Sequence, residues 1–225
     1  MIKKSYKNYK KILLLGAAGI GMSALARHVK NLNLKVDIHD DQKNQNFEEL
    51  KKENFNEFKG DIQTYDLVIY SLAIQANHPI REKFNKHQID SLSYPEALGM
   101  ILKKYPLIAI SGTHGKTTTT GMLIDIFSQN QEKFSALIGS KLLGHNNQNY
   151  IINPNSNVFI AEACEYQGGF LNYQPETLVI TNLEHEHFDS FPSQKSYLEN
   201  FQKLINQTQK NLILNQECKL SQNLE

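Results

Sequence analysis

The most specific chemical signal in the sequence is a glycine loop that ends in a lysine and a threonine, Ser111-Gly-Thr-His-Gly-Lys-Thr117. It follows an apolar run and precedes a helical pattern, a setting in which backbone N–H groups cradle phosphates. Lys116 would reach the β- and γ-phosphates, and the Thr117 hydroxyl can ligate Mg²⁺. The spacing departs from G-x-x-x-x-G-K-[ST], because the first glycine falls at Gly112. We predict that the phosphate-binding residues are Gly112, Thr113, His114, Gly115, Lys116, Thr117 and Thr118.

Carboxylates and histidines follow two later apolar runs, in Glu162-Ala-Cys-Glu165 and in Asn182-Leu-Glu-His-Glu-His-Phe-Asp189. An acid directly after a strand, beside a phosphate loop, is a usual position for a carboxylate that organises Mg²⁺. Glu162 is therefore the better candidate, whereas Glu165 is equally compatible with a surface position. His185 and His187 are compatible with zinc, but zinc sites usually have more His or Cys ligands, so we favour Mg²⁺ with oxygen ligands and one imidazole.

The remaining histidines show no such context. We expect ordinary surface or hydrogen-bonded side chains at His39, His78, His87 and His145.

A second glycine loop, Gly16-Ala-Ala-Gly19-Ile-Gly21, lies near the start of the chain. Its spacing is G-x-x-G-x-G rather than G-x-G-x-x-G. Small residues between a strand and a helix let the backbone approach a diphosphate, and Asp40 stands where an acid would bind a ribose. The loop is also compatible with a tight turn that binds nothing, and by itself it does not separate a nicotinamide dinucleotide from a UDP-sugar.

Composition excludes several classes of protein. The 225 residues are 40% hydrophobic and 21% charged, which is typical of a globular chain and not of a disordered one. The net charge of +1 gives no electrostatic footprint for nucleic acid or an anionic membrane. Cys164 and Cys218 lie far apart, so neither a disulfide framework nor a cysteine zinc site is expected. With no membrane span and no signal peptide recognised, we expect a cytoplasmic protein without nucleic-acid or membrane partners.

Strands alternate with helices along the chain, which predicts α/β architecture with parallel sheets. In the first half we expect strands at 11–15, 34–38 and 66–70, and helices at 22–32, 47–58, 80–87 and 94–102. The pattern restarts near 103–106, with strands expected at 107–110, 134–138, 158–161, 178–181 and 211–214, and helices at 117–128 and 193–206. We therefore predict a Rossmann-like parallel-sheet domain over 1–104, followed by an ATPase-type α/β domain with a phosphate loop over 105–225.

Several motifs occur together in the order found in the Mur ligases, a family of amide ligases. The loop 111–120 resembles the ATP loop of that family, and 182–189 resembles its N-I-x-x-D-H-x-D motif. Gly16 to Ser23 and the stretch 70–79 resemble the UDP-sugar segments of the branch that adds L-alanine to UDP-N-acetylmuramate. Glu162-Ala-Cys-Glu-Tyr166 with Phe170-Leu171 resembles another motif of that branch.

The resemblance implies roles for single residues. Lys116 would bind the γ-phosphate of ATP and Thr117 one Mg²⁺, while Glu162 and His187 would hold a second Mg²⁺, with Asn182 in the same cluster. Lys116, Glu162 and His187 are thus the expected catalytic residues. The expected UDP-sugar contacts are Gly16, Ala18, Gly19, Gly21, Met22, Ser23, Asp40, Ser71 and Asn77. The sequence departs from the family pattern at Glu186, at Gly168-Gly169, and at His78, which separates Asn77 from Pro79.

Three further expectations follow from the resemblance. The family has a third, C-terminal ligase domain, so we expect that this chain ends inside the second domain and that a partner chain or a missing half supplies the rest. The substrates would be UDP-N-acetylmuramate and L-alanine, with ATP and Mg²⁺ as cofactors. The alternatives are a ligase that recycles a murein tripeptide and a non-catalytic UDP-sugar or nucleotide-binding remnant. A nicotinamide dehydrogenase is disfavoured by the second phosphate loop.

Overall fold

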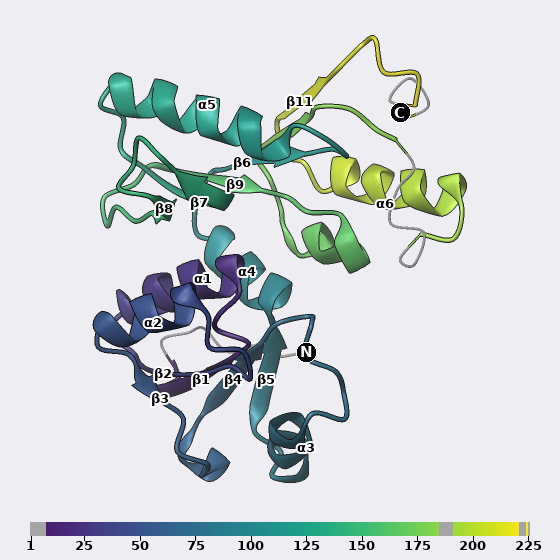
Figure 1. Ribbon diagram of the computed structural model, residues 1–225. Helices are drawn as coiled ribbons and strands as arrows, with labels where there is room; N and C mark the ends of the chain where they lie inside the picture. The colour runs from purple at the N-terminus through teal and green to yellow at the C-terminus, as the bar shows by residue number, and fades with distance from the viewer. Residues whose placement is uncertain (1–7, 185–190, 221–223, 225) are drawn as a thin grey trace. The chain divides into compact units, whose positions relative to one another are not determined.

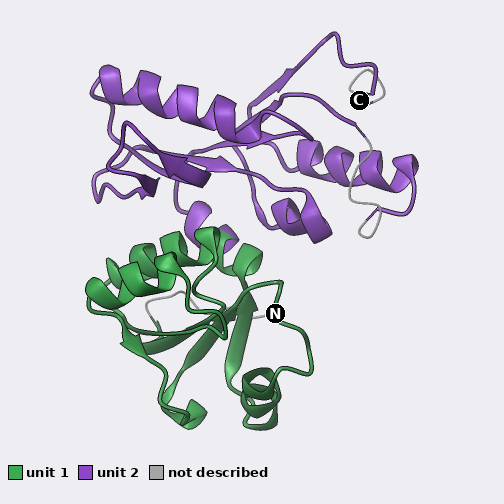
Figure 2. Cartoon of the chain, viewed as in Figure 1, with its two compact units in different colours: residues 1–98 green, residues 99–225 purple. Residues whose placement is uncertain are grey.

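The structure is a computed structural model that describes residues 8–184, 191–220 and 224. The chain divides into two compact units, Met1–Leu98 and Gly99–Glu225 (Figure 2). Each unit contains its own sheet, and each is described by itself below.

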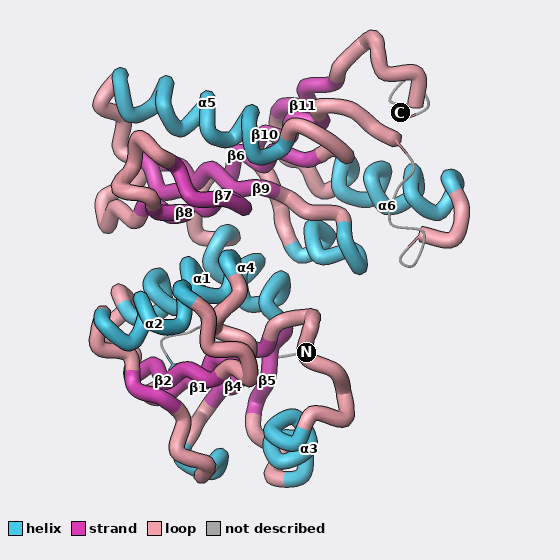
Figure 3. The backbone as a smooth tube through the Cα atoms, in the orientation of Figure 1, coloured by secondary structure: helices cyan, strands magenta, loops and turns pink. Residues whose placement is uncertain are grey.

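The first unit is a layered α/β fold around a five-stranded sheet in the order β3-β2-β1-β4-β5, in which every pairing is parallel (Figures 1 and 3). This order matches the first five strands of the 3-2-1-4-5-6 order of the Rossmann fold. Its strands are β1 (Lys11–Leu15), β2 (Lys35–His39), β3 (Asn56–Glu57), β4 (Leu67–Tyr70) and β5 (Asp90–Ser93). Its helices are α1 (Ile20–Lys30), α2 (Gln45–Lys52), η2 (Ile62–Thr64), α3 (Pro79–Lys86) and α4 (Tyr94–Leu102), the last of which runs into the second unit.

The central strand β1 is apolar because helices cover both faces of the sheet. Ile12 to Leu15 are fully buried, as expected of a parallel strand between two helical layers. On one face, Leu13 and Leu15 pack with Phe84 of α3 and Tyr65. Helices α1 and α2 contact each other, and α1 also contacts β2. Because β1 lies between β2 and β4 and all three are parallel, their carboxyl ends lie side by side at one edge of the sheet.

The second unit is built on a six-stranded sheet in the order β11-β10-β6-β9-β7-β8. Its strands are β6 (Leu107–Ser111), β7 (Phe134–Leu142), β8 (Gln148–Ile151), β9 (Val158–Glu162), β10 (Thr177–Ile180) and β11 (Asn211–Leu214). Its helices are α5 (Lys116–Gln129), η3 (Tyr166–Asn172) and α6 (Gln194–Asn206). All pairings are parallel except β7 with β8. Figure 1 shows α5 on one side of the strands and the green η3 segment on the other.

Helix α5 is fixed by its apolar face, and helix α6 by the residues at its start. Helix α5 packs on β6, β7 and β9, with Ile124 facing a core that includes Ile110 and Ile160. Helix α6 begins at a capping box, in which the Ser193 hydroxyl accepts from the N–H of Ser196 and the Ser196 hydroxyl is bonded back to the Ser193 backbone.

The predicted α/β architecture is confirmed, and most predicted elements lie within a few residues of their observed bounds. Three corrections are needed. The stretch 47–58 is not one helix: α2 ends at Lys52, Asn54 takes a left-handed conformation (φ 63°), and β3 follows. Strands β5 and β8 were not predicted, because Asp90–Ser93 and Gln148–Ile151 are too polar to read as buried strands. The second sheet is mixed rather than purely parallel, because β8 folds back on β7 as a hairpin.

No helix in the described part of the chain has both the length and the apolar character needed to cross a membrane.

Candidate functional site

Three loops meet at the carboxyl edge of the second sheet because β6 lies between β9 and β10. The loop after β6 carries 112–115, the loop after β9 carries 163–165, and the loop after β10 carries 181–184. Open parallel sheets bind ligands at this edge. The topology thus brings together the phosphate loop, Glu162, Glu165 and Asn182, as the sequence motifs require.

Glycine is needed at both bends of the phosphate loop. Gly112 has φ 124°, and a Cβ there would collide with Thr181 Oγ1 and lie 2.8 Å from the Asn182 carbonyl oxygen. Gly115 has φ 79° and is the N-cap of α5, where a Cβ would meet open space. The first glycine therefore permits a close approach to the neighbouring strand, whereas the second permits only the left-handed turn into the helix.

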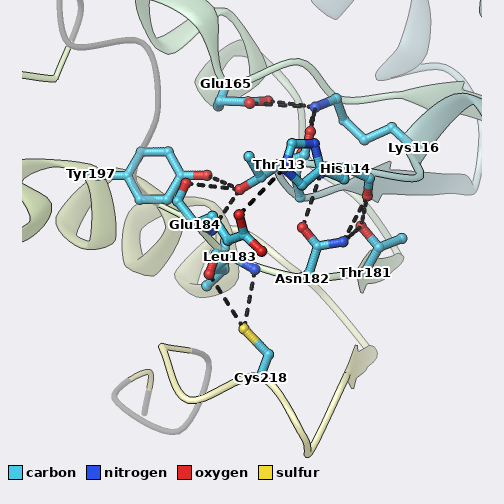
Figure 4. A network of polar contacts seen from close by, with 11 residues as sticks. Thr113, His114, Lys116, Glu165, Thr181, Asn182, Leu183, Glu184, Tyr197 and Cys218 are labelled. Atoms are coloured by element: carbon cyan, nitrogen blue, oxygen red, sulfur yellow. Dashed lines mark hydrogen bonds and ion pairs between the residues drawn. The ribbon is translucent and has the colours of Figure 1, made fainter.

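Two side chains that follow β10 bind the backbone of the phosphate loop at His114 (Figure 4). The His114 N–H donates to Asn182 Oδ1 at 2.9 Å, and Asn182 Nδ2 donates to the His114 carbonyl oxygen at 2.9 Å. Thr181 Oγ1 donates to the same carbonyl oxygen at 2.6 Å. Asn182 thus contacts the phosphate loop directly and fixes its middle residue.

Thr113 holds the loop from its other side. Its hydroxyl lies 2.7 Å from the hydroxyl of the fully buried Tyr197, accepts from the N–H of Glu184 at 2.7 Å, and lies 3.0 Å from the Glu184 carbonyl oxygen. The His114 imidazole and the Glu184 carboxylate, both largely exposed, are 3.4 Å apart. Tyr197 belongs to α6, far along the sequence, so no local motif predicted this contact.

Lys116 lies beside a fully buried carboxylate. Its Nζ is 3.2 Å from one oxygen of Glu165 and 3.3 Å from the other, and Glu165 is 0% exposed. Lys116 Nζ also donates to the carbonyl oxygens of Gly112 at 2.5 Å and Thr113 at 2.9 Å (Figure 4). The surface position that the sequence left open for Glu165 is therefore wrong, and the lysine is held folded over its own loop.

Glu162 lies at the end of β9 with one oxygen unsatisfied. Its Oε1 is buried and has no hydrogen-bond partner among the described residues. Its Oε2 faces Gly139, where an added Cβ would come within 2.6 Å. A buried carboxylate oxygen without a partner is costly, and a bound cation would satisfy it.

The structure describes some of the other predicted residues of this site and not others. Thr117 is half-buried in the first turn of α5, and the neighbouring Thr118 is exposed. His185, Glu186 and His187 lie outside the described residues, so the predicted metal ligand His187 stays a prediction.

The first glycine loop contacts the loop after β4. Gly16 has φ 88°, and a Cβ there would lie 2.7 Å from Ser71 Cβ, so only glycine fits. The N–H groups of Gly16 and Ala17 donate to the His39 carbonyl oxygen at 2.8 and 3.1 Å. Gly21 faces Tyr94, whose hydroxyl would be 2.7 Å from an added Cβ. The structure thus brings Gly16 and Ser71 together, while Gly19 and Asn77 are exposed.

Both carboxylate oxygens of Asp40 accept hydrogen bonds from backbone N–H groups. Its Oδ2 accepts from the N–H of Ala18 at 2.8 Å and its Oδ1 from the N–H of Gln42 at 2.9 Å. Met22 and Ser23 are buried, and the Ser23 hydroxyl donates to the Ile20 carbonyl oxygen. These contacts give Asp40, Met22 and Ser23 a role in shaping the loop.

The histidines are hydrogen-bonded, as expected, but two of them converge. His87 contacts Gln63, and His145 lies 2.9 Å from Asp125. His39 and His78 both contact one carboxylate, that of Asp41. Partial burial acts to raise the pKa of Asp41, but hydrogen bonds with the two imidazoles outweigh it and hold that pKa below its usual value.

Known protein families match both units. The model of the Mur ligase middle domain matches residues 110–225, and the model of the Mur ligase family catalytic domain matches residues 11–106. The chain belongs to the Mur ligase family. Among curated members of that family, the UDP-N-acetylmuramate–L-alanine ligase of Borreliella burgdorferi is 32% identical over 223 residues, covering 95% of this chain and 47% of that protein. The enzyme of the same name from Acetivibrio thermocellus is 36% identical over 190 residues, covering 81% of this chain and 40% of that protein.

Solved Mur ligase structures share the fold. The UDP-N-acetylmuramate–alanine ligase of Thermotoga maritima superposes with a TM-score of 0.85 at 24% identity, covering 96% of this chain and 51% of that one. A UDP-N-acetylmuramate:L-alanyl-γ-D-glutamyl-meso-diaminopimelate ligase from Neisseria meningitides superposes with a TM-score of 0.86 at 22% identity. The match covers 95% of this chain and 74% of that one. This Mur ligase chain spans about half the length of the curated relatives it matches.

Proposed function

We propose that this chain carries the UDP-sugar-binding and ATP-binding parts of a ligase that joins L-alanine to UDP-N-acetylmuramate at the expense of ATP. The family membership supports an ATP-dependent ligase, and the relatives of 32% and 36% identity bear the name of this activity. The proposed domains are 1–104 for the UDP-sugar and 105–225 for ATP. A cytoplasmic location stays a prediction.

One observation carries the proposal: at the carboxyl edge of the sheet, a lysine of a phosphate loop pairs with one buried carboxylate, and a second carboxylate ends the adjacent strand. Lys116 contacts Glu165, and Glu162 ends the adjacent strand with a buried, unpartnered oxygen. This is the arrangement that the transfer of a phosphoryl group to a carboxylate needs, because negative groups must be neutralised as they approach one another.

In the proposed reaction the muramate carboxylate attacks the γ-phosphorus of ATP, releasing ADP and forming an acyl phosphate. The amine of L-alanine then attacks the acyl carbon, and phosphate leaves as the amide forms. Lys116 would leave the Gly112 and Thr113 carbonyl oxygens and bind the γ-phosphate. The N–H groups at the start of α5 would hold the other phosphates.

The residues present fit a magnesium ion. Mg²⁺ prefers oxygen ligands, and the orphaned Glu162 Oε1 and the Thr117 hydroxyl supply them. We propose that Thr117 would hold one Mg²⁺ and that Glu162 and His187 would hold a second, and these ions would neutralise negative charge between ATP and the substrate carboxylate. In unit 1 we propose that Gly16 to Gly21, with Ser71 and Asn77, hold the UDP-sugar, while Asp40 keeps the loop in shape.

Calorimetry on the 225-residue chain tests the two binding functions separately, with UDP-N-acetylmuramate in one titration and Mg-ATP in another. Catalysis is tested on the whole polypeptide that carries these residues in the cell. ADP release should require ATP, Mg²⁺, UDP-N-acetylmuramate and L-alanine together. ADP release that is independent of the amino acid and the UDP-sugar would contradict the proposal.

The alternative acceptor is a murein tripeptide. The fold likeness does not distinguish the two acceptors, because the TM-score is 0.86 to a ligase named for such a peptide and 0.85 to the alanine ligase. The sequence relatives favour L-alanine. A direct comparison of L-alanine and tripeptide as acceptors in the assay above separates the two. A non-catalytic remnant would bind ligands and release no ADP with either.

A further inference from the structure

A cluster of two imidazoles and one carboxylate in unit 1 includes none of the residues proposed above to hold a ligand. His39 Nε2 lies 3.3 Å from Asp41 Oδ1, and His78 Nε2 lies 3.1 Å from Asp41 Oδ2. One ligand atom from each of the three residues lies within 4.8 Å of the other two. We propose that His39, Asp41 and His78 bind one transition-metal ion of the Zn²⁺ class.

The spacing fits such an ion once the three ligand atoms draw together around it. A tetrahedral Zn²⁺ holds nitrogen and oxygen ligands about 2.0–2.2 Å away, which places neighbouring ligand atoms roughly 3.4 Å apart. The two imidazole–carboxylate separations, 3.3 Å to Oδ1 and 3.1 Å to Oδ2 of Asp41, are close to that value, and the ligand atoms of all three residues lie within 4.8 Å of one another. The two rings are 6.3 Å apart at an interplanar angle of 67°, so both can point at one centre without stacking.

Exposure gives the ion an entry path and an open position. The side chains of His39 and His78 are 22% and 13% exposed, whereas that of Asp41 is 65% exposed. The His39 imidazole is held from behind by an edge-to-face contact with Phe58, and His78 is the N-cap residue of α3. Two imidazoles and one carboxylate with a solvent-facing fourth position is a ligand set of known zinc sites, and it is poor for Mg²⁺ or Ca²⁺.

Metal binding would change which ring nitrogen of His78 carries the proton. Its Nδ1 accepts from the N–H of Ile80 at 3.2 Å, so in the metal-free protein the ring proton is on Nε2 and faces Asp41. Coordination through Nε2 requires that proton to move to Nδ1, which breaks the hydrogen bond from Ile80. The Ile80 amide is therefore a built-in reporter of His78 ligation.

The position of the cluster gives the ion a structural consequence. Asp41 lies in the loop after β2 and His78 in the loop after β4, and β1 runs between these two strands toward the first glycine loop (Figure 1). The His39 carbonyl oxygen accepts from the first two residues of that glycine loop. A bound ion would tie together the two loops that border it.

The test is a Zn²⁺ titration of the 225-residue chain by calorimetry, repeated on variants. His39→Ala and Asp41→Asn should each weaken one equivalent of binding at least tenfold. His78→Asn should do the same while keeping α3 intact, because asparagine is a favoured N-cap. His87→Asn, which replaces a histidine of the same unit that contacts Gln63, is the matched control and should bind as the parent chain does.

Nuclear magnetic resonance on the same samples gives the second readout. The Ile80 amide resonance should shift on saturation with Zn²⁺, and millimolar Mg²⁺ should not displace the ion. The proposal is overturned if no equivalent of Zn²⁺ is lost in the three variants, if the Ile80 amide does not move, or if Mg²⁺ displaces the zinc.

Discussion

Glu162 and Glu165 belong to one motif, but only Glu165 is paired with a positively charged side chain. Glu165 is fully buried and pairs with Lys116, whereas the buried oxygen of Glu162 has no hydrogen-bond partner among the described residues. Removing one member of a buried ion pair leaves the other charge uncompensated, whereas neutralising an unpaired buried carboxylate relieves a desolvation cost. The two carboxylates are therefore separable by experiment.

We predict that Glu165→Gln destabilises unit 2 by about 2 kcal/mol, somewhat less than the ~3–5 kcal/mol typical of a broken buried pair, because the glutamine oxygen can still accept from Lys116. Glu162→Gln, the matched variant, should leave the free energy of unfolding of the ligand-free chain unchanged or raised, yet abolish Mg²⁺-dependent ATP binding. Urea unfolding and calorimetry measure the two effects. Equal destabilisation by both variants would contradict the distinct roles.

Lys116→Ala is predicted to remove ATP binding and to leave UDP-N-acetylmuramate binding unchanged. The lysine contacts Gly112, Thr113 and Glu165, all within unit 2, whereas the first glycine loop lies in unit 1. Paired calorimetric titrations of the variant check both ligands. Loss of both affinities together would show that the ligand sites are not divided between the units as proposed.

At the scale of elements, the strands that position both loops follow from apolar runs alone. Lys11–Leu15 and Leu107–Ser111 are short, apolar and followed by glycine, and each is the central strand that leads to a loop. The polar strands β5 and β8 are formed by pairing with neighbours rather than by their own pattern, so periodicity could not identify them. Tyr197 and Thr181 brace the phosphate loop from elements distant in sequence, and such contacts exist only once the sheet has formed.

The two glycines of the phosphate loop should respond differently to substitution, because one is packed against β10 and the other is not. Gly112→Ala must move either Thr181 or the Asn182 backbone and also strains φ 124°, so we expect a cost of about 3 kcal/mol and loss of ATP binding. Gly115→Ala meets open space and adds only left-handed strain of about 1 kcal/mol. Thermal unfolding and ATP titration of both variants test this order, and a reversed order would contradict the packing around Gly112.

At the scale of the whole molecule, the six-stranded sheet has an apolar edge. Strand β11 pairs with β10, and no described strand pairs with its other side. On this strand Leu212 and Ile213 are 38% and 54% exposed. An edge strand with exposed apolar side chains is a template for pairing with another chain.

We therefore predict that the 225-residue chain self-associates through β11 as its concentration rises. Ile213→Lys should shift the monomer–dimer equilibrium toward monomer by about tenfold or more, because a charge would be buried at the pairing edge, while changing the free energy of unfolding by less than ~0.5 kcal/mol, as is usual for an exposed site. Leu143→Lys is the control, since Leu143 is 90% exposed but belongs to the turn between β7 and β8. Sedimentation velocity over a concentration series measures the equilibrium. A chain that stays monomeric, or one that responds equally to both lysines, would show that β11 is not the surface of association.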